Sequence, residues 1–287
     1  MKWIVVIVVL VAVVVALLRF GSRSVATAPS AGIIPAMPFK VLGTLAGSPL
    51  IQEVESPRPD LFRMAVVRGE EALAAIPELD RLEEANGWRA VFLGAVDEFP
   101  DFDALREMDA QSPSDILREA ETIDAAAILA QRAGEWSQGN IDGAEILGEW
   151  PDEAAAASAL PERYAVFRNV LTDQAHERVY IAIIPTAEAW QAPAFLQNGS
   201  WNDVPSPAEQ VSVLRYWQAR HGARLRTFSN DVMELEVQRP PGSKDQAMAL
   251  AKEQYGFCYD IVDQGVGALR PLAATLEHAG NWYFWWD

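Results

Sequence analysis

The chain has 287 residues and a formal net charge of −17, from 23 basic and 40 acidic side chains. A field of this sign repels phosphate backbones, so no nucleic acid is expected as a partner. The single cysteine, Cys258, excludes an intramolecular disulfide and any cysteine-rich zinc site. Hydrophobic residues make up 50% of the chain, which indicates a folded core rather than a disordered chain.

The chain begins with an unbroken apolar run, residues 3–18, which basic residues flank on both sides. As a helix this run reaches about 24 Å, so residues 1–20 predict a thin, single-pass anchor in the inner cell membrane. The alternative is a cleaved signal segment, because residues 26–28 have the small-x-small pattern of a cleavage site. The basic residues before and after the run balance each other, which leaves the side of the soluble body undetermined.

Composition divides the remainder of the chain into three parts. Residues 21–38 are rich in Ser, Ala, Gly and Pro, which is typical of a linker. We expect an acidic α/β part over residues 39–155 and an α+β domain over residues 156–287. Residues 51–160 hold 25 acidic and 8 basic side chains. They predict either a solvated acidic surface or an acidic face for a basic protein partner.

In the acidic part, hydrophobic periodicity predicts a strand over 62–67, a helix over 70–85 and a strand over 88–95. This order indicates a β-α-β unit. Ser112 followed by proline is a good helix start, and the apolar spacing behind it predicts one helix that continues to about residue 136.

The α+β domain is expected to begin with two strands, 164–171 and 179–184, joined as a hairpin. The second strand is apolar on both faces, which is typical of a central strand. Ser206 and Glu209 form a capping box, which predicts a helix from there to about residue 222.

Two alternating strands follow, 223–228 and 232–237, and they predict a second hairpin with a three-residue turn. This register places opposite charges outside and apolar residues inside. Residues whose numbers sum to 460 then face each other: Arg224 with Glu236, Leu225 with Leu235, Arg226 with Glu234, and Thr227 with Met233.

Beyond this hairpin, Ser243 and Gln246 form another capping box at the start of a helix. A last helix is expected over 269–278, and an aromatic strand over 282–286. The predicted fold class is therefore α+β, with an antiparallel or mixed sheet packed by helices and preceded by an N-terminal transmembrane helix.

Several segments of the C-terminal half carry a family resemblance. They are Gly199-Ser200-Trp201-Asn202 with Pro205, Leu214-Arg215-Tyr216-Trp217, Arg239-Pro240-Pro241, Ala249-Leu250-Ala251 with Glu253-Gln254-Tyr255, Cys258 with Asp260, and the ending Trp282-Tyr283-Phe284-Trp285-Trp286-Asp287. In this order they resemble the bacterial domain-of-unknown-function family DUF 4253, over about residues 160–287 and less closely over residues 61–94. The family usually has proline after the cysteine, where this chain has Tyr259. The resemblance implies no established activity, catalytic residue or cofactor.

No catalytic residue, metal or cofactor follows from the sequence, although some candidates exist. Cys258 is the one thiol, and it would need a base such as His221 or His278 to act as a nucleophile. The alternative is a buried thiol that packs between aromatic neighbours. The acidic residues between 97 and 103 are either loose ligands for Ca²⁺ or a solvated acidic loop.

A polar cluster near the end of the chain is the candidate ligand-binding cleft. It comprises Trp201, Asn202, Cys258, Asp260, Asp263 and Gln264. We therefore expect a membrane-anchored, non-enzymatic binding or interaction module, a class that includes immunity and regulatory proteins. The alternative is a cysteine-dependent or metal-dependent hydrolase or transferase with Cys258 near a histidine.

Overall fold

Seven strands and the helices around them make up the described part of the chain. The computed structural model describes residues 52–95, 110–152, 156, 164–169, 172–199 and 202–287. The strands are β1 (Gln52–Val54), β2 (Arg63–Val67), β3 (Arg89–Ala95), β4 (Val179–Ile184), β5 (Arg224–Phe228), β6 (Val232–Glu236) and β7 (Asn281–Trp285).

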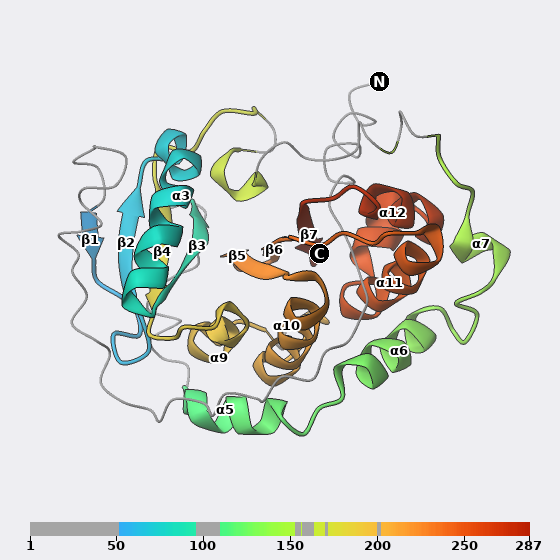
Figure 1. Cartoon of the computed structure of the whole chain (residues 1–287), viewed down its shortest axis with the longest axis horizontal. Helices are drawn as coiled ribbons and strands as arrows, with labels where there is room; N and C mark the ends of the chain where they lie inside the picture. Colours follow the sequence, from blue (N-terminus) through green and yellow to red (C-terminus); the bar gives the residue numbers. More distant parts are fainter. Residues whose placement is uncertain (1–51, 96–109, 153–155, 157–163, 170–171, 200–201) are drawn as a thin grey trace.

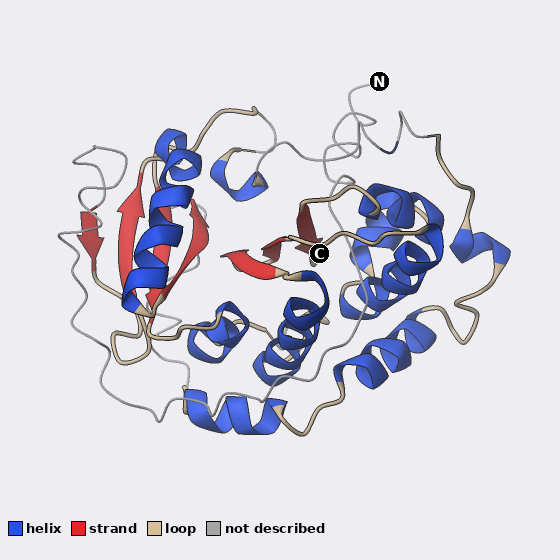
Figure 2. Cartoon of the chain, viewed as in Figure 1, coloured by secondary structure: helices blue, strands red, loops and turns tan. Residues whose placement is uncertain are grey.

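The helices are α3 (Gly69–Asn86), α5 (Pro113–Ala120), α6 (Ala125–Trp136), α7 (Ala144–Leu147), α9 (Ala192–Leu196), α10 (Pro207–His221), α11 (Lys244–Phe257) and α12 (Leu269–Leu276). Shorter turns are the 3₁₀ helices η2 (Ala165–Phe167) and η3 (Ala189–Gln191) and the π-helix η4 (Ile261–Val266). Figure 2 shows how the helices surround the strands.

The strands form one mixed sheet in the order β1-β2-β4-β3-β5-β6-β7. The pair β3–β5 is parallel, and the other neighbouring pairs are antiparallel. The α+β fold class with a mixed sheet is therefore confirmed. The predicted strands and helix of the β-α-β unit are present as β2, α3 and β3, but β4 lies between the two strands. Because β4 follows residue 155, the sheet joins the two expected parts of the chain.

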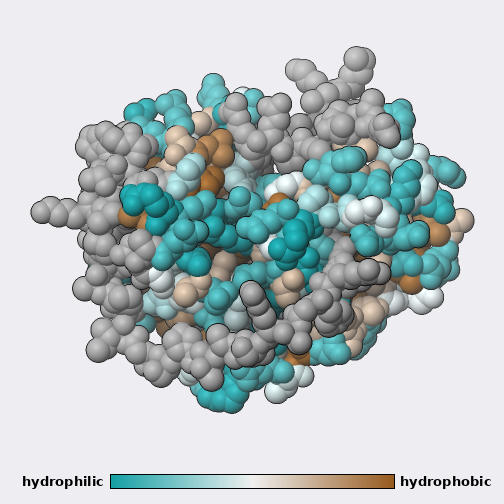
Figure 3. Space-filling view, viewed as in Figure 1, coloured by the Kyte–Doolittle hydropathy of each residue, from teal (hydrophilic) through white to brown (hydrophobic). Residues whose placement is uncertain are grey.

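The sheet is buried on both faces. On one face α3 lies over β2, β4 and β3 (Figure 1). Alanine and leucine side chains of α3 belong to the core cluster on this face. On the other face, α9, α10, α11 and α12 form a larger core with the aromatic side chains of β7. Trp217 of α10 stacks on Phe284 at a ring distance of 5.5 Å. On the surface of Figure 3, hydrophilic residues predominate and hydrophobic areas are small and separate.

Residues 110–152, named the belt here, run along the outside of α10 and α11 (Figure 1). The prediction of one helix from residue 113 to 136 is wrong, because α5 ends at Ala120 and α6 starts at Ala125. Asp124 starts the second helix by accepting a hydrogen bond from the Ala127 amide at 3.1 Å. This cap stabilises a new helix start and lets the belt bend around the body.

The predicted strand over residues 164–171 is also wrong over residues 164–169, and its last two residues lie outside the described ranges. Residues 165–167 form η2, and one isolated bridge links Arg168 to Ala175. Both edges of β4 already pair with β2 and β3, so the expected hairpin partner has no free edge to join.

The hairpin of β5 and β6 is confirmed, but its register changes halfway along. Arg224 faces Glu236 and Leu225 faces Leu235 as predicted, whereas Thr227 faces Glu234 and Phe228 faces Met233. Arg226 is the extra residue of a β-bulge. The prediction that the charges face outward is wrong as well, since Arg226 and Glu234 are both fully buried.

Helix starts follow their capping signals closely. The capping box of Ser206 and Glu209 is confirmed in both directions. At α11 half of the predicted box is present: Ser243 accepts a hydrogen bond from the Gln246 amide, whereas the Gln246 side chain accepts from Gly242 instead. The predicted last helix and terminal strand correspond to α12 and β7.

The expected anchor over residues 1–20 and the linker over residues 21–38 lie outside the described residues. Within the ranges that the structure describes, the helices are all too short or too polar to cross a bilayer. Anchoring therefore stays a prediction from the sequence.

The contact between the belt and α11 depends on a glycine. A Cβ added at Gly256 would overlap the carbonyl group of Leu129 in α6 and lie 3.1 Å from the Ala133 nitrogen. Because these are backbone atoms, we expect Gly256→Ala to lower the free energy of unfolding by about 1–3 kcal/mol. Urea unfolding monitored by circular dichroism measures this change.

Gly134→Ala in α6 is the matched control. A Cβ at Gly134 meets no atom within 4 Å, so the same substitution removes a flexible residue without a clash. It should leave stability unchanged or raise it by up to about 1 kcal/mol. Equal effects of the two substitutions would contradict close packing of α6 on α11.

Candidate functional site

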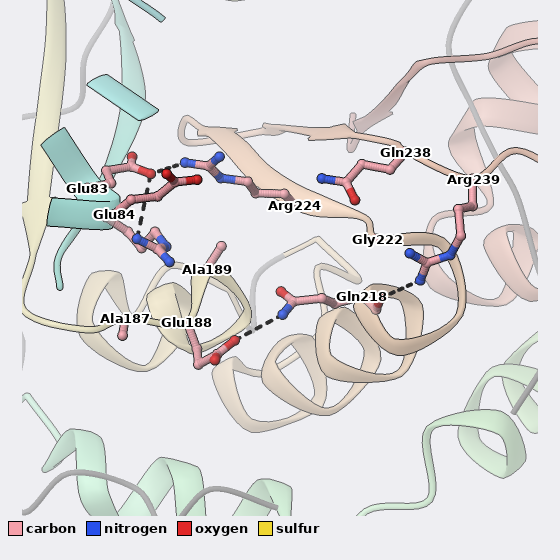
Figure 4. Close-up of a pocket in the computed structure, with 11 residues that line it drawn as sticks. Glu83, Glu84, Ala187, Glu188, Ala189, Gln218, Gly222, Arg224, Gln238 and Arg239 are labelled. Carbon is pink, nitrogen blue, oxygen red and sulfur yellow. Dashed lines mark hydrogen bonds and ion pairs between the residues drawn. The ribbon is translucent and has the colours of Figure 1, made fainter. Parts of the chain in front are cut away.

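A polar pocket of about 280 Å³ opens where the β-α-β unit meets the hairpin and the end of α10 (Figure 4). Three carboxylates, three guanidinium groups and two side-chain amides face it. The lining residues are Glu83, Glu84, Arg89, Ala187, Glu188, Ala189, Gln218, Gly222, Arg224, Gln238 and Arg239. We name this the polar pocket.

Glu83 of α3 is held rigidly at one wall of the polar pocket. Its side chain is 1% exposed, and Oε1 accepts a hydrogen bond from the Ala90 amide at 2.7 Å. Oε2 forms an ion pair with Arg224 of β5 and lies 3.8 Å from Nη1 of Arg89. Burial of Glu83 is tolerated because its oxygens have charged or hydrogen-bonding partners.

A partly buried ion cluster lies beside this wall and joins α3 to the hairpin. We name it the Arg226 cluster, and it comprises Asp80, Glu83, Arg224, Arg226 and Glu236. Arg226 is fully buried, and its Nε and Nη2 atoms donate to Glu236 at 3.2 and 2.8 Å. Nη2 also donates to Asp80. The β-bulge at Arg226 thus contributes a guanidinium group that binds carboxylates of α3 and β6 together.

The opposite wall of the polar pocket comes from α10 and the segments beside it. Glu188 accepts hydrogen bonds from Nε2 of Gln218 at 2.9 Å and from the indole of Trp190 at 3.1 Å. Arg239 donates to the main-chain carbonyls of three residues in the last turn of α10. These contacts hold the guanidinium at a helix C-terminus, where a positive charge is favourable.

The polar pocket therefore presents fixed charges of both signs. Glu84 of α3 and Glu188 lie toward one end, and Gln238 and Arg239 lie toward the other (Figure 4). Such walls are suited to hydrogen bonding and ion pairing with a small polar ligand, rather than to enclosing an apolar one.

The structure places the Cys258 thiol in the core. The residue is 1% exposed, and its Sγ donates to the carbonyl oxygen of Trp285 at 3.0 Å. Burial raises the pKa of the Cys258 thiol far above its ordinary value. The sulfur is therefore protonated at neutral pH, whereas nucleophilic catalysis requires the thiolate.

The structure does not bring Cys258 and His221 together. The His221 ring is buried next to Trp282, and its Nδ1 lies 2.7 Å from the carbonyl oxygen of Arg239. Trp282 and Trp285 are three residues apart on β7, which corresponds to about 10 Å along a strand. Burial lowers the pKa of His221 to about 4, so the ring is neutral at pH 7.

His278 is exposed in the turn between α12 and β7. It therefore lies toward the start of β7, whereas the Cys258 thiol binds Trp285 at the end of that strand.

The residues of the expected cleft after Cys258 gather around the π-helix. Asp260 accepts hydrogen bonds from the Gln264 amide at 2.8 Å and from the Asp287 nitrogen at 3.2 Å. Asp263 accepts from the Tyr255 hydroxyl at 3.4 Å. Burial raises the pKa of Asp260, and nearby carboxylates add to this shift.

The other two cleft residues precede α10. Asn202 has a φ of +43° in the left-handed region, and Trp201 lies outside the described residues. Over the ranges that the structure describes, no three His, Cys, Asp or Glu side chains gather as metal ligands. The acidic loop between residues 97 and 103 is not among those ranges.

Sequence reasoning missed the residues of the polar pocket. The alternating Arg and Glu residues of the hairpin were a visible signal, but they indicated a surface ladder rather than an ion cluster under α3. Glu83 and Glu188 gave no signal, because their roles depend on contacts with residues far away in the sequence.

Comparison with known proteins confirms the resemblance for the C-terminal part of the chain. Residues 180–287 match the family model described as "Domain of unknown function (DUF4253)". No curated protein and no solved structure matches the chain. The matched region begins within β4 and includes one wall of the polar pocket, whereas Glu83, Glu84 and Arg89 precede it.

The Arg226 cluster predicts a large effect of its central residue. Replacing Arg226 with methionine leaves Asp80, Glu236 and the buried Glu83 without this guanidinium. We expect the free energy of unfolding to fall by about 1.5–3 kcal/mol, as when hydrogen bonds to charged groups are removed, because Asp80 and Glu83 keep Arg224 as a partner. Urea unfolding measures the change.

Arg118→Met is the matched control, because Arg118 is exposed and pairs with Asp115 on the same helix. This substitution should cost less than about 1 kcal/mol. The double variant Arg226→Met/Glu236→Gln should lose less than the sum of its single variants, because the residues share one contact. A loss below about 1 kcal/mol for Arg226→Met would show that the cluster does not hold α3 to the hairpin.

Proposed function

We propose that this protein is a non-enzymatic binding module whose polar pocket takes a small ligand bearing both a positive and a negative group. The observation that carries this proposal is that carboxylates and guanidinium groups line the same pocket. An ammonium group would lie near Glu84 and Glu188, and a carboxylate would lie near Arg239.

The size and rigidity of the polar pocket support the proposal. Its volume of about 280 Å³ is close to the lower end of the range for small-molecule sites, about 300–1,000 Å³. Glu83, Glu188 and Arg239 are already held by neighbouring groups. A ligand would then meet preorganised partners, which lowers the entropic cost of binding.

The state of Cys258 favours binding over cysteine-dependent catalysis. Its thiol is buried, protonated and hydrogen-bonded to a backbone carbonyl. A nucleophile of this kind would have to leave the core before it could meet a substrate.

We further propose a basic protein as a partner of the acidic face, residues 51–160. All nine acidic side chains of the belt are exposed, against two arginines in the same segment. One of these arginines, Arg132, is paired with Glu209 of α10. A surface of this kind attracts a positively charged protein and speeds its association.

The N-terminal apolar run supports a tether to the inner membrane. We expect the full chain to remain with the membrane fraction after an alkaline carbonate wash. A variant that begins at residue 29 should appear in the supernatant, because it lacks the apolar run. An intact mass that begins near residue 29 in cells expressing the full chain would instead establish a cleaved signal segment.

Four forms of one dipeptide test the polar pocket. Glycylglycine itself carries a positive amino group and a negative carboxylate. Its C-terminal amide carries only the positive charge, and its N-acetyl form carries only the negative charge. The form that is blocked at both ends carries no charge. At ten times its Kd, glycylglycine should stabilise the fold by about 1.4 kcal/mol and raise Tm by about 3–5 °C. The other three forms should raise Tm less, because each lacks at least one ion pair.

Arg239→Gln and Glu188→Gln should each remove most of this shift, whereas Arg118→Gln, which is outside the polar pocket, should keep it. The proposal fails if the four dipeptide forms act alike. It also fails if none of them raises Tm up to 50 mM, or if the shift survives both pocket substitutions.

A further inference from the structure

A second pocket, of about 370 Å³, lies between the end of α6 and the start of α10. We name it the belt pocket. Its lining residues are Arg132, Glu135, Trp136, Asp203, Val204, Ser206 and Glu209. It shares no residue with the polar pocket, and Asn202 of the expected cleft directly precedes it in the chain.

An aromatic side chain forms one wall of the belt pocket. Trp136 is half-buried, and its ring packs against that of Tyr259 with centroids 4.7 Å apart and an angle of 41° between the planes. Tyr259 follows Cys258 at the end of α11, so the C-terminal part of the chain holds the tryptophan in place. An indole face is the aromatic surface that attracts cations most strongly.

The charges around the belt pocket do not cancel. Arg132 and Glu209 neutralise each other through two hydrogen bonds of 2.8 and 2.9 Å. Glu135 and Asp203 remain, and no cation within the described ranges forms an ion pair with either of them. Glu135 accepts a hydrogen bond from the neutral amide of Gln131 at 2.9 Å.

Asp260 and Asp263 add negative charge close to Tyr259. Burial raises the pKa of Tyr259, and the charges of Asp260, Asp203 and Asp263 raise it further. These charges make the electrostatic potential at this edge of the belt negative. The exposed acidic side chains of the belt extend that field and would steer a cation toward the pocket.

We infer that the belt pocket binds an organic cation, an ammonium or guanidinium group on an apolar stem. The charged group would lie against the face of Trp136, between the carboxylates of Glu135 and Asp203. The stem would contact the buried Val204. Such a cation is present in a free small amine and also in a Lys or Arg side chain of the basic partner proposed above. Only the second source rests on that proposal.

Calorimetric titration with charged and neutral isosteres tests the site. The probes are choline against 3,3-dimethylbutan-1-ol, and acetyl-lysine amide against acetyl-norleucine amide. The charged member of each pair should bind, and its affinity should fall as salt rises from 50 to 300 mM. The neutral members should not bind measurably.

Trp136→Leu should weaken binding of the charged probes about 5- to 30-fold, because the cation–π contact is lost. Since this variant also removes packing with Tyr259, Glu135→Gln/Asp203→Asn provides a second test. Asparagine tolerates the φ of +63° at position 203, so this double variant should fold normally. It should weaken binding at least tenfold and reduce the salt dependence. Glu145→Gln, an exposed belt residue outside the pocket, should change affinity less than twofold.

Comparison with a lysine-rich peptide identifies the source of the cation. Much tighter binding of the peptide than of acetyl-lysine amide assigns the site to a partner side chain, and equal affinities assign it to a small amine. The inference is overturned if neutral and charged isosteres bind alike. It is also overturned if no charged probe binds up to 50 mM, or if both pocket variants bind as the unmodified chain does.

Discussion

The pairing of the buried Arg226 guanidinium with carboxylates of α3 and β6 is the interaction on which the rest of the structure depends. It holds two units that a single parallel pair, β3–β5, otherwise joins within the sheet. The Nε and Nη2 atoms of this buried guanidinium donate to Glu236 and Asp80, and these two contacts connect α3 to the hairpin. The same cluster holds the side chains of Arg224 and Glu83 in place, and these two residues form a wall of the polar pocket.

How well the sequence predicts a structural feature depends on how far apart in the sequence the interacting residues lie. Helix starts at Ser206 and Ser243 were predictable because a cap acts within one turn. Residues 179–184 are apolar on both faces of the strand, and this local pattern indicated a central strand. The burial of Arg226 at the register change was not predictable, because its partner Asp80 lies 146 residues away in the sequence. The two pockets were missed for the same reason, since side chains from distant segments line each of them.

Both pockets lie where the region that matches DUF4253 meets the chain before it. Glu83 and Arg89 contribute to the polar pocket, and Arg132 and Trp136 contribute to the belt pocket, all from outside residues 180–287. The matched region supplies the opposite walls. The lining of both pockets is thus shared between the matched region and the segment preceding it.

The position of β4 has a consequence for biosynthesis. As the chain leaves the ribosome, β2 and β3 emerge long before their common neighbour, since Met64 pairs with Ala182 and Val91 pairs with the same residue. Until then both strands expose unpaired edges, which are prone to join other chains. Closing the long loop between these strands and β4 is also slow, because the chain loses conformational entropy before the strand pairing contributes stabilising free energy. These strands therefore gain their common partner only after synthesis has passed residue 184.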